Sequence, residues 1–99
     1  MSDFSTGDLD PIIHGKLRLG VMAFLASAGS ASFTTLRQKT DATDGNLSTH
    51  LRKLEEAGYI KIEKRFEQRK PLSVVSLSDK GRTAWIEYLG KMQTLLSGG

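Results

Sequence analysis

One stretch, TDGNLSTHLRKLEEAG at residues 43–58, constrains the fold of this chain more than any other. Thr43 or Asp44 can accept hydrogen bonds from the free N–H groups of a first helical turn, and Gly58 suits the left-handed backbone just past a helix end. We therefore predict a helix over residues 44–57. Its apolar residues recur at i, i+4 and i+7 and form one narrow stripe: Leu47, Leu51 and Leu54.

The opposite side of this helix is small, polar and basic over its first two turns. A short helix with such an outer face is shaped to enter a groove of a polyanion, and we interpret it as the recognition helix of a helix-turn-helix. On a helical wheel this side carries Gly45, Thr49, Arg52 and Glu56, flanked by Ser48 and Lys53.

Length and composition limit the other classes of protein. Ninety-nine residues make one small domain, and no apolar run approaches the roughly 20 residues that span a bilayer. The first ten residues are acidic and polar, unlike a secretory signal. The chain has no cysteine, which excludes disulfides and thiolate metal sites and is compatible with a reducing cytosol. We expect a cytoplasmic protein with no membrane partner and no cofactor or metal.

The positive charge is concentrated in one segment. Residues 61–70 hold five Lys or Arg against Glu63 and Glu67, a local charge of five minus two, or +3, which equals the net charge of the whole chain. The first ten residues carry three Asp and no Lys or Arg. Such a concentrated basic patch favours a polyanionic partner.

The N-terminal part predicts a tail and one long helix. Residues 1–8 have the composition of a disordered tail, and a helix is expected from about Asp10 to Ala28, with Pro11 in its first turn. Ile12, Leu19 and Met22 lie to one side of it and predict a second buried surface, against another subunit. The main apolar face is expected to comprise Ile13, Leu17, Gly20, Val21 and Phe24.

The remaining segments predict a short strand, a helix, a hairpin and a final helix. Residues 29–33 allow only a brief strand, and a helix follows over 34–40. After Gly58 the apolar period changes to two, so residues 59–66 and 71–77 predict two strands around an exposed tip at 67–70. Ser78 is a good N-cap for a helix ending at Leu96. Its apolar stripe predicts dimerisation through Trp85, Tyr88, Leu89, Met92 and Leu95.

This order of elements is the winged-helix arrangement, an α+β and mostly helical fold. The residues from TDGNLSTHLRKLEEAG through the Arg69-Lys70-Pro71 tip to Leu77-Ser78-x-x-Gly81-Arg82 also resemble small stand-alone winged-helix transcriptional regulators related to the MarR and ArsR families. The resemblance extends over residues 9–96. It implies one DNA-binding domain with a C-terminal dimerisation helix, followed by a flexible end at 97–99.

The resemblance also implies which residues contact double-stranded DNA. The third helix would contact bases in the major groove, and the wing (residues 61–71) would lie along the backbone or enter the minor groove. Glu67-Gln68-Arg69 is similar to the acidic-spacer-Arg wing of MarR proteins and nominates Arg69 for the minor groove. The helix residues are Thr43, Gly45, Asn46, Ser48, Thr49, Arg52 and Lys53, and the wing residues are Lys64, Arg65, Arg69 and Lys70.

Two departures from those families restrict the expectation. The ArsR metal sensors use cysteine clusters, which this chain lacks, so no metal-sensing role is expected. Full-length MarR proteins are longer, with extra helices around a ligand pocket, so a small-molecule effector is not expected either. The sequence therefore predicts a homodimeric DNA-binding regulator that addresses two half-sites about one helical turn apart.

Alternatives remain for several of these residues. Asn46 and Ser48 could merely satisfy the first helical turn, and Arg52 could form a solvated pair with Glu55 or Glu56. The charged wing could simply guard a sheet edge, and the domain could bind protein rather than DNA or, less favoured, structured RNA. His14 and His50 are expected to be structural. An enzyme is not expected, because the sequence has no phosphate loop, nucleophile motif or metal cluster.

Overall fold

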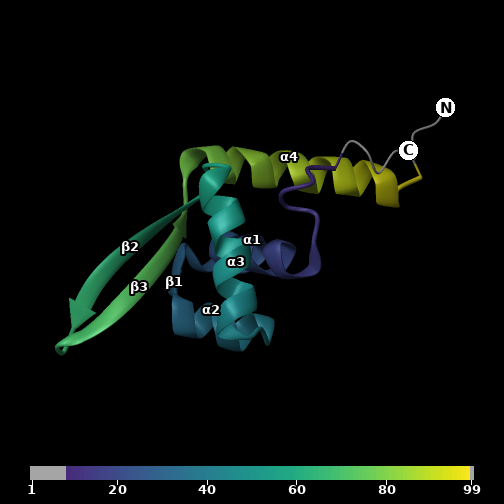
Figure 1. The fold of residues 1–99 in the computed structure, drawn as a ribbon. Helices are drawn as coiled ribbons and strands as arrows, with labels where there is room; N and C mark the ends of the chain where they lie inside the picture. Colours follow the sequence, from purple (N-terminus) through teal and green to yellow (C-terminus); the bar gives the residue numbers. More distant parts are fainter. Residues whose placement is uncertain (1–8, 99) are drawn as a thin grey trace.

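The computed structural model describes residues 9–98, so the tail predicted at residues 1–8 lies outside the described part, as does Gly99. Residues 9–98 form four helices and one three-stranded antiparallel sheet (Figure 1). The α+β, mostly helical winged-helix fold is confirmed. The elements in chain order are α1 (Lys16–Ala28), β1 (Ser30–Ser32), α2 (Phe33–Thr40), α3 (Asp44–Glu56), β2 (Ile60–Glu67), β3 (Lys70–Leu77) and α4 (Asp79–Leu96).

Three of the helices begin at hydroxyl caps. The side chains of Ser32, Thr43 and Ser78 accept hydrogen bonds from backbone N–H groups in the first turns of α2, α3 and α4. These bonds satisfy donors that have no partner inside a helix. The caps explain why the predicted starts of α3 and α4 match the structure. At the other end of α3, Gly58 has φ 82°, the left-handed conformation that its position predicted.

The first helix begins later than predicted, at Lys16 instead of near Asp10. Residues 11–13 form a turn in which the Asp10 carboxylate accepts the N–H of Ile12 at 2.8 Å. The Arg18 guanidinium then donates to the carbonyl oxygen of Ile12 at 2.6 Å. Because a side chain occupies this carbonyl and Gly15 is fully extended (φ −173°), the helix cannot continue back to Asp10.

The sheet has the order β1-β3-β2, and β2 and β3 form a long hairpin. Their register runs from Ile60 opposite Leu77 to Glu67 opposite Lys70, without interruption. Gln68 and Arg69 make the two-residue turn with φ of 52° and 66°. The exposed tip predicted at 67–70 is therefore present, but only its two central residues lie outside the strands.

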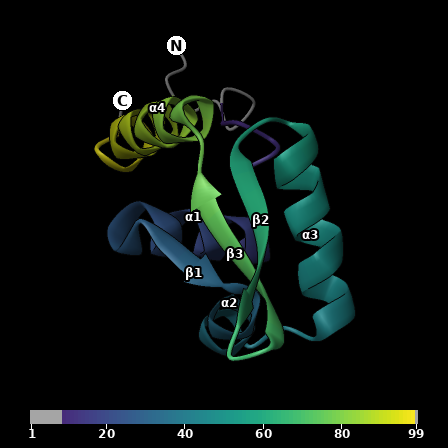
Figure 2. The ribbon, with the colours of Figure 1, turned by 90° about the vertical axis from the view of Figure 1, so that its left-hand side faces the viewer.

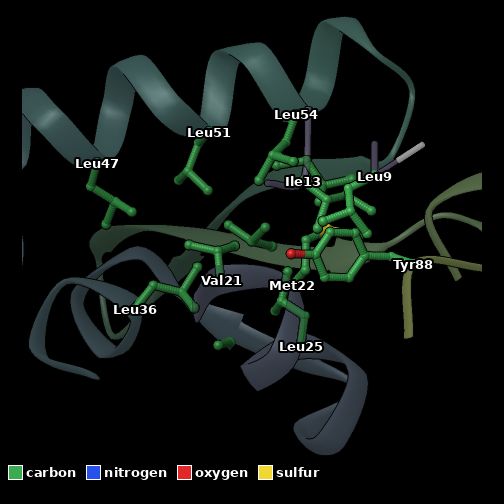
Figure 3. Packing of buried hydrophobic residues seen from close by; sticks show 13 residues of the cluster. Leu9, Ile13, Val21, Met22, Leu25, Leu36, Leu47, Leu51, Leu54 and Tyr88 are labelled. Atoms are coloured by element: carbon green, nitrogen blue, oxygen red, sulfur yellow. The ribbon is translucent and has the colours of Figure 1, made fainter. Parts of the chain in front are cut away.

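The core lies between the sheet and the first three helices, with one side chain from α4 (Figure 3). The predicted leucine stripe of α3 is confirmed, since all three leucines are buried. Of the predicted apolar face, Ile13 and Val21 are fully buried, although Ile13 lies in the turn before α1, whereas Leu17, Gly20 and Phe24 are half-buried. Met22 and Leu25 complete the buried side of α1.

Two residues predicted for a subunit interface belong to this core, and the prediction is corrected for them. Met22 is 0% exposed and Tyr88 2% exposed within the single chain. The Tyr88 hydroxyl lies 2.8 Å from Nδ1 of His14, and its ring stacks on Trp85 at 5.8 Å. Side chains that are already enclosed cannot contact a partner subunit.

Helix α4 and the hairpin tip lie at opposite ends of the molecule. Figures 1 and 2 both place α4 at one end, and α2, the start of α3 and the hairpin tip at the opposite end. In Figure 1 the hairpin projects sideways beyond the helices. None of the helices described within residues 9–98 is long and apolar enough to cross a bilayer.

Candidate nucleic-acid interface

Helix α3 exposes one polar face. Because its leucines point into the core, the opposite side of the helix is left to solvent. Thr43, immediately before the helix, is also exposed. The structure thus brings the predicted helix residues together on what we call the α3 polar face: Gly45, Asn46, Ser48, Thr49, Arg52 and Lys53, all exposed.

Two hydroxyls of this region are already engaged within the helix. Thr43 Oγ1 accepts the N–H of Asn46 at 3.1 Å, and Thr49 Oγ1 donates to the carbonyl of Gly45 at 3.0 Å. The first turn is therefore capped by Thr43, not by the side chains of Asn46 or Ser48. Within residues 9–98, neither of those two side chains makes a hydrogen bond, so both retain their full capacity for a ligand.

The cations of the α3 polar face have no acidic partner. The alternative that Arg52 pairs with Glu55 or Glu56 is not observed, because Arg52 forms no ion pair within residues 9–98. The Arg52 guanidinium keeps all of its donors available, in the planar fork that fits guanine or phosphate.

An ion pair that the sequence analysis missed joins α2 to α3. Nε of Arg37 lies 3.1 Å from Oδ1 of Asp44, the first residue of α3. Asp44 stabilises the start of the helix through the helix dipole, but its charge would repel a phosphate. Arg37 offsets that charge at this end of the molecule. No local spacing pattern links these residues, since their contact depends on the geometry of the turn between the helices.

The predicted cations of the wing divide between the two sides of the ribbon. Lys64 lies on the side that carries the buried Ile60 near the base of the hairpin, whereas Lys61 and Arg65 lie on the other. Arg65 donates from Nε and Nη2 to Oε1 of Glu63, at 3.0 and 2.6 Å, and this carboxylate raises the pKa of Arg65. Glu63 therefore partly offsets the positive charge of Arg65.

The other two predicted wing cations lie near the tip. Arg69 occupies the turn, while Lys70 stands opposite Glu67 in the strand register. Lys64 and Arg69 form no ion pair within residues 9–98. Of the four predicted wing cations, these two are the most suitable for contacting a polyanion.

The structure attaches α3 to α1 through His50. Nη1 of Arg18 lies 2.8 Å from Nδ1 of His50, at an open groove between α1 and the α2–α3 link. Burial lowers the pKa of His50, and the nearby charges of Arg18 and Lys53 lower it further. The half-buried, structural role predicted for His50 agrees with this contact, although its partner was not predicted.

The described residues 9–98 contain no group of three or more His, Cys, Asp or Glu side chains that could hold a metal ion. The α3 polar face instead exposes polar and basic side chains. A helix-turn-helix whose second helix is exposed, followed by a projecting two-stranded wing, defines the winged-helix class of protein.

The family comparison agrees with this class. The family described as the winged helix DNA-binding domain matches residues 17–96, and the chain belongs to that family. A relative described as an uncharacterized protein of Methanocaldococcus jannaschii is 32% identical over 78 residues, which cover 79% of this chain and 85% of that protein.

Solved structures show the same relationship. The chain is similar to a transcriptional regulator homologue from Pyrococcus horikoshii OT3, with 33% identity, a TM-score of 0.83 and coverage of 88% of this chain and 86% of the other. It shares the fold of a MarR-family regulator from Enterococcus faecalis V583, with 23% identity, a TM-score of 0.71 and coverage of 88% and 80%. The chain is thus a member of the winged helix DNA-binding domain family and shares its fold with a regulator of the MarR family.

Proposed function

We propose that this protein is a cytoplasmic, sequence-specific regulator that binds double-stranded DNA as a homodimer. Helix α3 enters the major groove, and the wing lies on the backbone and in the minor groove. One observation carries the proposal: the α3 polar face is exposed and contains unpaired cations, and α3 begins at the end of the molecule where the wing tip lies (Figure 2).

Two kinds of contact would supply binding. Lys53, Lys64 and Arg69 would neutralise phosphates and release counterions, which gives affinity without sequence preference. Arg52 would donate two hydrogen bonds to a guanine, while Asn46 and Ser48 would reach base edges or phosphates. A Cβ at Gly45 would meet no protein atom within 4 Å. The bare backbone there leaves room for a phosphate at the start of the helix.

The dimer would form through α4. Ile86 is 63% exposed, Leu89 46% and Leu96 79%, and these three apolar side chains form a row on one helix that the described chain covers only in part. A second copy would bury them, together with the exposed parts of the half-buried residues Ile12, Leu19, Trp85, Met92 and Leu95. Because α4 lies opposite the wing tip, two α3 helices would remain free to face DNA.

The competing function is a protein-binding winged helix. The α3 polar face argues against it, because its cations are exposed while Glu55 and Glu56 lie at the far end of the helix. A protein-binding module has no need for an uncompensated basic face beside a basic wing. No observation favours the RNA alternative, since the described part of α3 lacks an aromatic stacking platform.

Selection from a pool of random duplexes tests the proposal. We expect enrichment of an inverted repeat whose half-sites are about 10 base pairs, or one helical turn, apart. Arg52→Ala should relax the preference at one guanine and cost about 1–3 kcal/mol on the selected site. Arg82→Ala, which removes an exposed cation of α4, should leave the selection unchanged. A wild-type protein that enriches no sequence would contradict the proposal.

A further inference from the structure

The wing carries an apolar side chain that the proposed dimer does not use. Phe66 is 80% exposed, and the other large exposed hydrophobic residues of the described chain, Ile86, Leu89 and Leu96, all lie on α4. Figures 1 and 2 place α4 at the end opposite the hairpin tip. A dimer formed through α4 would therefore leave Phe66 exposed, and this residue needs a separate explanation.

The strand register shows what surrounds Phe66. It stands directly opposite Pro71, which is also exposed, and the next pair on the same side of the ribbon is Lys64 with Ser73. Nearer the base, this side carries Ile62 opposite the buried Val75. One side of the ribbon packs on the core at the base of the hairpin. Near the tip, the same side carries the apolar pair of Phe66 and Pro71 beside Lys64.

The turn adds a second cation to this pair. Gln68 and Arg69 both have positive φ, which suits glycine and asparagine better than long side chains. A compact Asn-Gly turn would make the same hairpin at lower conformational cost. The chain instead presents the long side chain of Arg69 at the tip, within a few residues of Phe66 and Pro71.

Cations beside an apolar pair fit one surface of DNA in particular. The minor groove is about 6 Å wide, and its walls are the carbon-rich faces of the sugars between two rows of phosphates. Its potential attracts arginine, and proteins that bind there often add Phe or Pro contacts. Major-groove phosphates alone would offer nothing to an exposed aromatic ring.

We propose that Phe66 and Pro71 form an apolar contact with the minor groove of double-stranded DNA, beside Arg69, so that the wing supplies affinity that salt does not screen. This inference rests on the proposed DNA-binding function and adds a binding contact to it. The wing then has two separable contributions, an electrostatic one from Lys64 and Arg69 and an apolar one from Phe66.

The dependence of binding on salt separates these contributions. For duplex binding measured at several salt concentrations, Phe66→Ala should weaken affinity about tenfold at every concentration, because about half of an aromatic side chain loses its burial. The slope of log K against log salt should stay that of the wild type. Arg69→Ala should instead make the slope shallower by about 1.8 in the proposed dimer, because each protomer loses one phosphate contact worth about 0.9. Phe66→Leu, the matched control, should retain most of the affinity.

A second measurement locates the wing. The chain has no cysteine, so Gln68→Cys provides a single attachment site for an iron–EDTA cleavage reagent. The inference predicts cleavage of the two DNA strands with the 3′-shifted pattern of a reagent in the minor groove. Cleavage with the opposite shift, or with no preferred position on a selected site, would overturn it.

The outcomes distinguish this inference from the proposed function. If the wild type binds DNA and Phe66→Ala binds within twofold of it, the apolar contact is wrong and the DNA-binding function stands. If Phe66→Ala changes the sedimentation of the free protein, its partner is a second copy of the chain, and the inference is also wrong. If the wild type binds no duplex at low salt, the proposed function itself fails. Urea unfolding should give Phe66→Ala the wild-type midpoint, because its side chain is largely exposed.

Discussion

Arg37 of α2 and Asp44, the first residue of α3, form an ion pair of 3.1 Å that connects the two helices of the helix-turn-helix. Their side chains are 42% and 77% exposed, so the pair contributes less than about 1 kcal/mol to stability. Its greater effect concerns charge, because the pair offsets a carboxylate at the edge of the α3 polar face.

The first prediction concerns this pair. Asp44→Asn should strengthen DNA binding severalfold, because it removes a negative charge near the phosphates, whereas Arg37→Met should weaken binding about tenfold by leaving Asp44 uncompensated. Both variants should unfold within about 1 kcal/mol of the wild type. Anisotropy titrations on one duplex compare the affinities. Equal affinities for the two variants would show that the pair does not face DNA.

The second prediction concerns the pH dependence of stability. The pKa of His50 is lowered in the folded protein by burial and by Arg18 and Lys53, whereas an unfolded histidine titrates near 6.5. The unfolded chain therefore binds a proton that the folded chain does not, and the free energy of unfolding should fall as the pH drops below about 6.5. The loss of stability should stop once the pH falls below the pKa that His50 has in the folded protein.

Urea denaturation between pH 7.5 and 5 measures this effect. His50→Gln, which keeps a side chain able to accept from Arg18, should remove this component of the pH dependence. The control is His14→Gln, because His14 is exposed and contacts Tyr88 instead of a cation. If the wild type and His50→Gln lose stability in parallel, the Arg18–His50 contact is not coupled to folding.

The third prediction concerns two glycines of α4. A Cβ at Gly81 would lie 1.9 Å from the carbonyl oxygen of Tyr59, an overlap with backbone that no rotamer relieves. Gly81→Ala should therefore destabilise the protein by about 3 kcal/mol. Gly90 has no neighbour within 4 Å of such an atom, so Gly90→Ala should stabilise the helix by about 0.5–1 kcal/mol. Urea midpoints of both variants check the pair, and a tolerated Gly81→Ala would contradict the packing of α4 on the α3–β2 junction.

The fourth prediction concerns the α4 dimer. Ile86→Glu combined with Leu89→Glu should give a folded monomer, because two charges cannot be buried in an apolar interface. Circular dichroism should remain that of the wild type, since both residues are exposed in the single chain. Sedimentation at micromolar concentration measures the mass. A wild type that sediments as a monomer would refute the dimer, whatever the variant does.

Local patterns predicted most of the fold. The α3 leucine stripe, the hydroxyl caps at Thr43 and Ser78 and the switch to period two after Gly58 depend on neighbouring residues only, and the structure agrees with all of them. The late start of α1 was not predictable in this way, because it depends on Arg18 reaching back to the carbonyl of Ile12.

The errors in the interface prediction have a related cause. The sequence predicts a subunit interface at Met22 and Tyr88 because, within one isolated helix, an apolar side chain on a second face has no visible partner. In the folded chain α1 is covered on more than one side, and Tyr88 packs back onto the core. Contacts between distant elements, such as Arg37–Asp44 and Arg18–His50, likewise have no signature in spacing.

Binding to a random-sequence duplex across a range of salt concentrations tests the central claim most directly. The account predicts that log K falls with log salt with a slope steeper than about −4, as several phosphate contacts at roughly 0.9 each require. Arg52→Ala and Arg69→Ala should each weaken binding, while Arg82→Ala, on α4, should not. If the wild type does not bind even at low salt, or if the three variants bind equally, DNA binding through α3 and the wing is contradicted, and a protein-binding function takes its place.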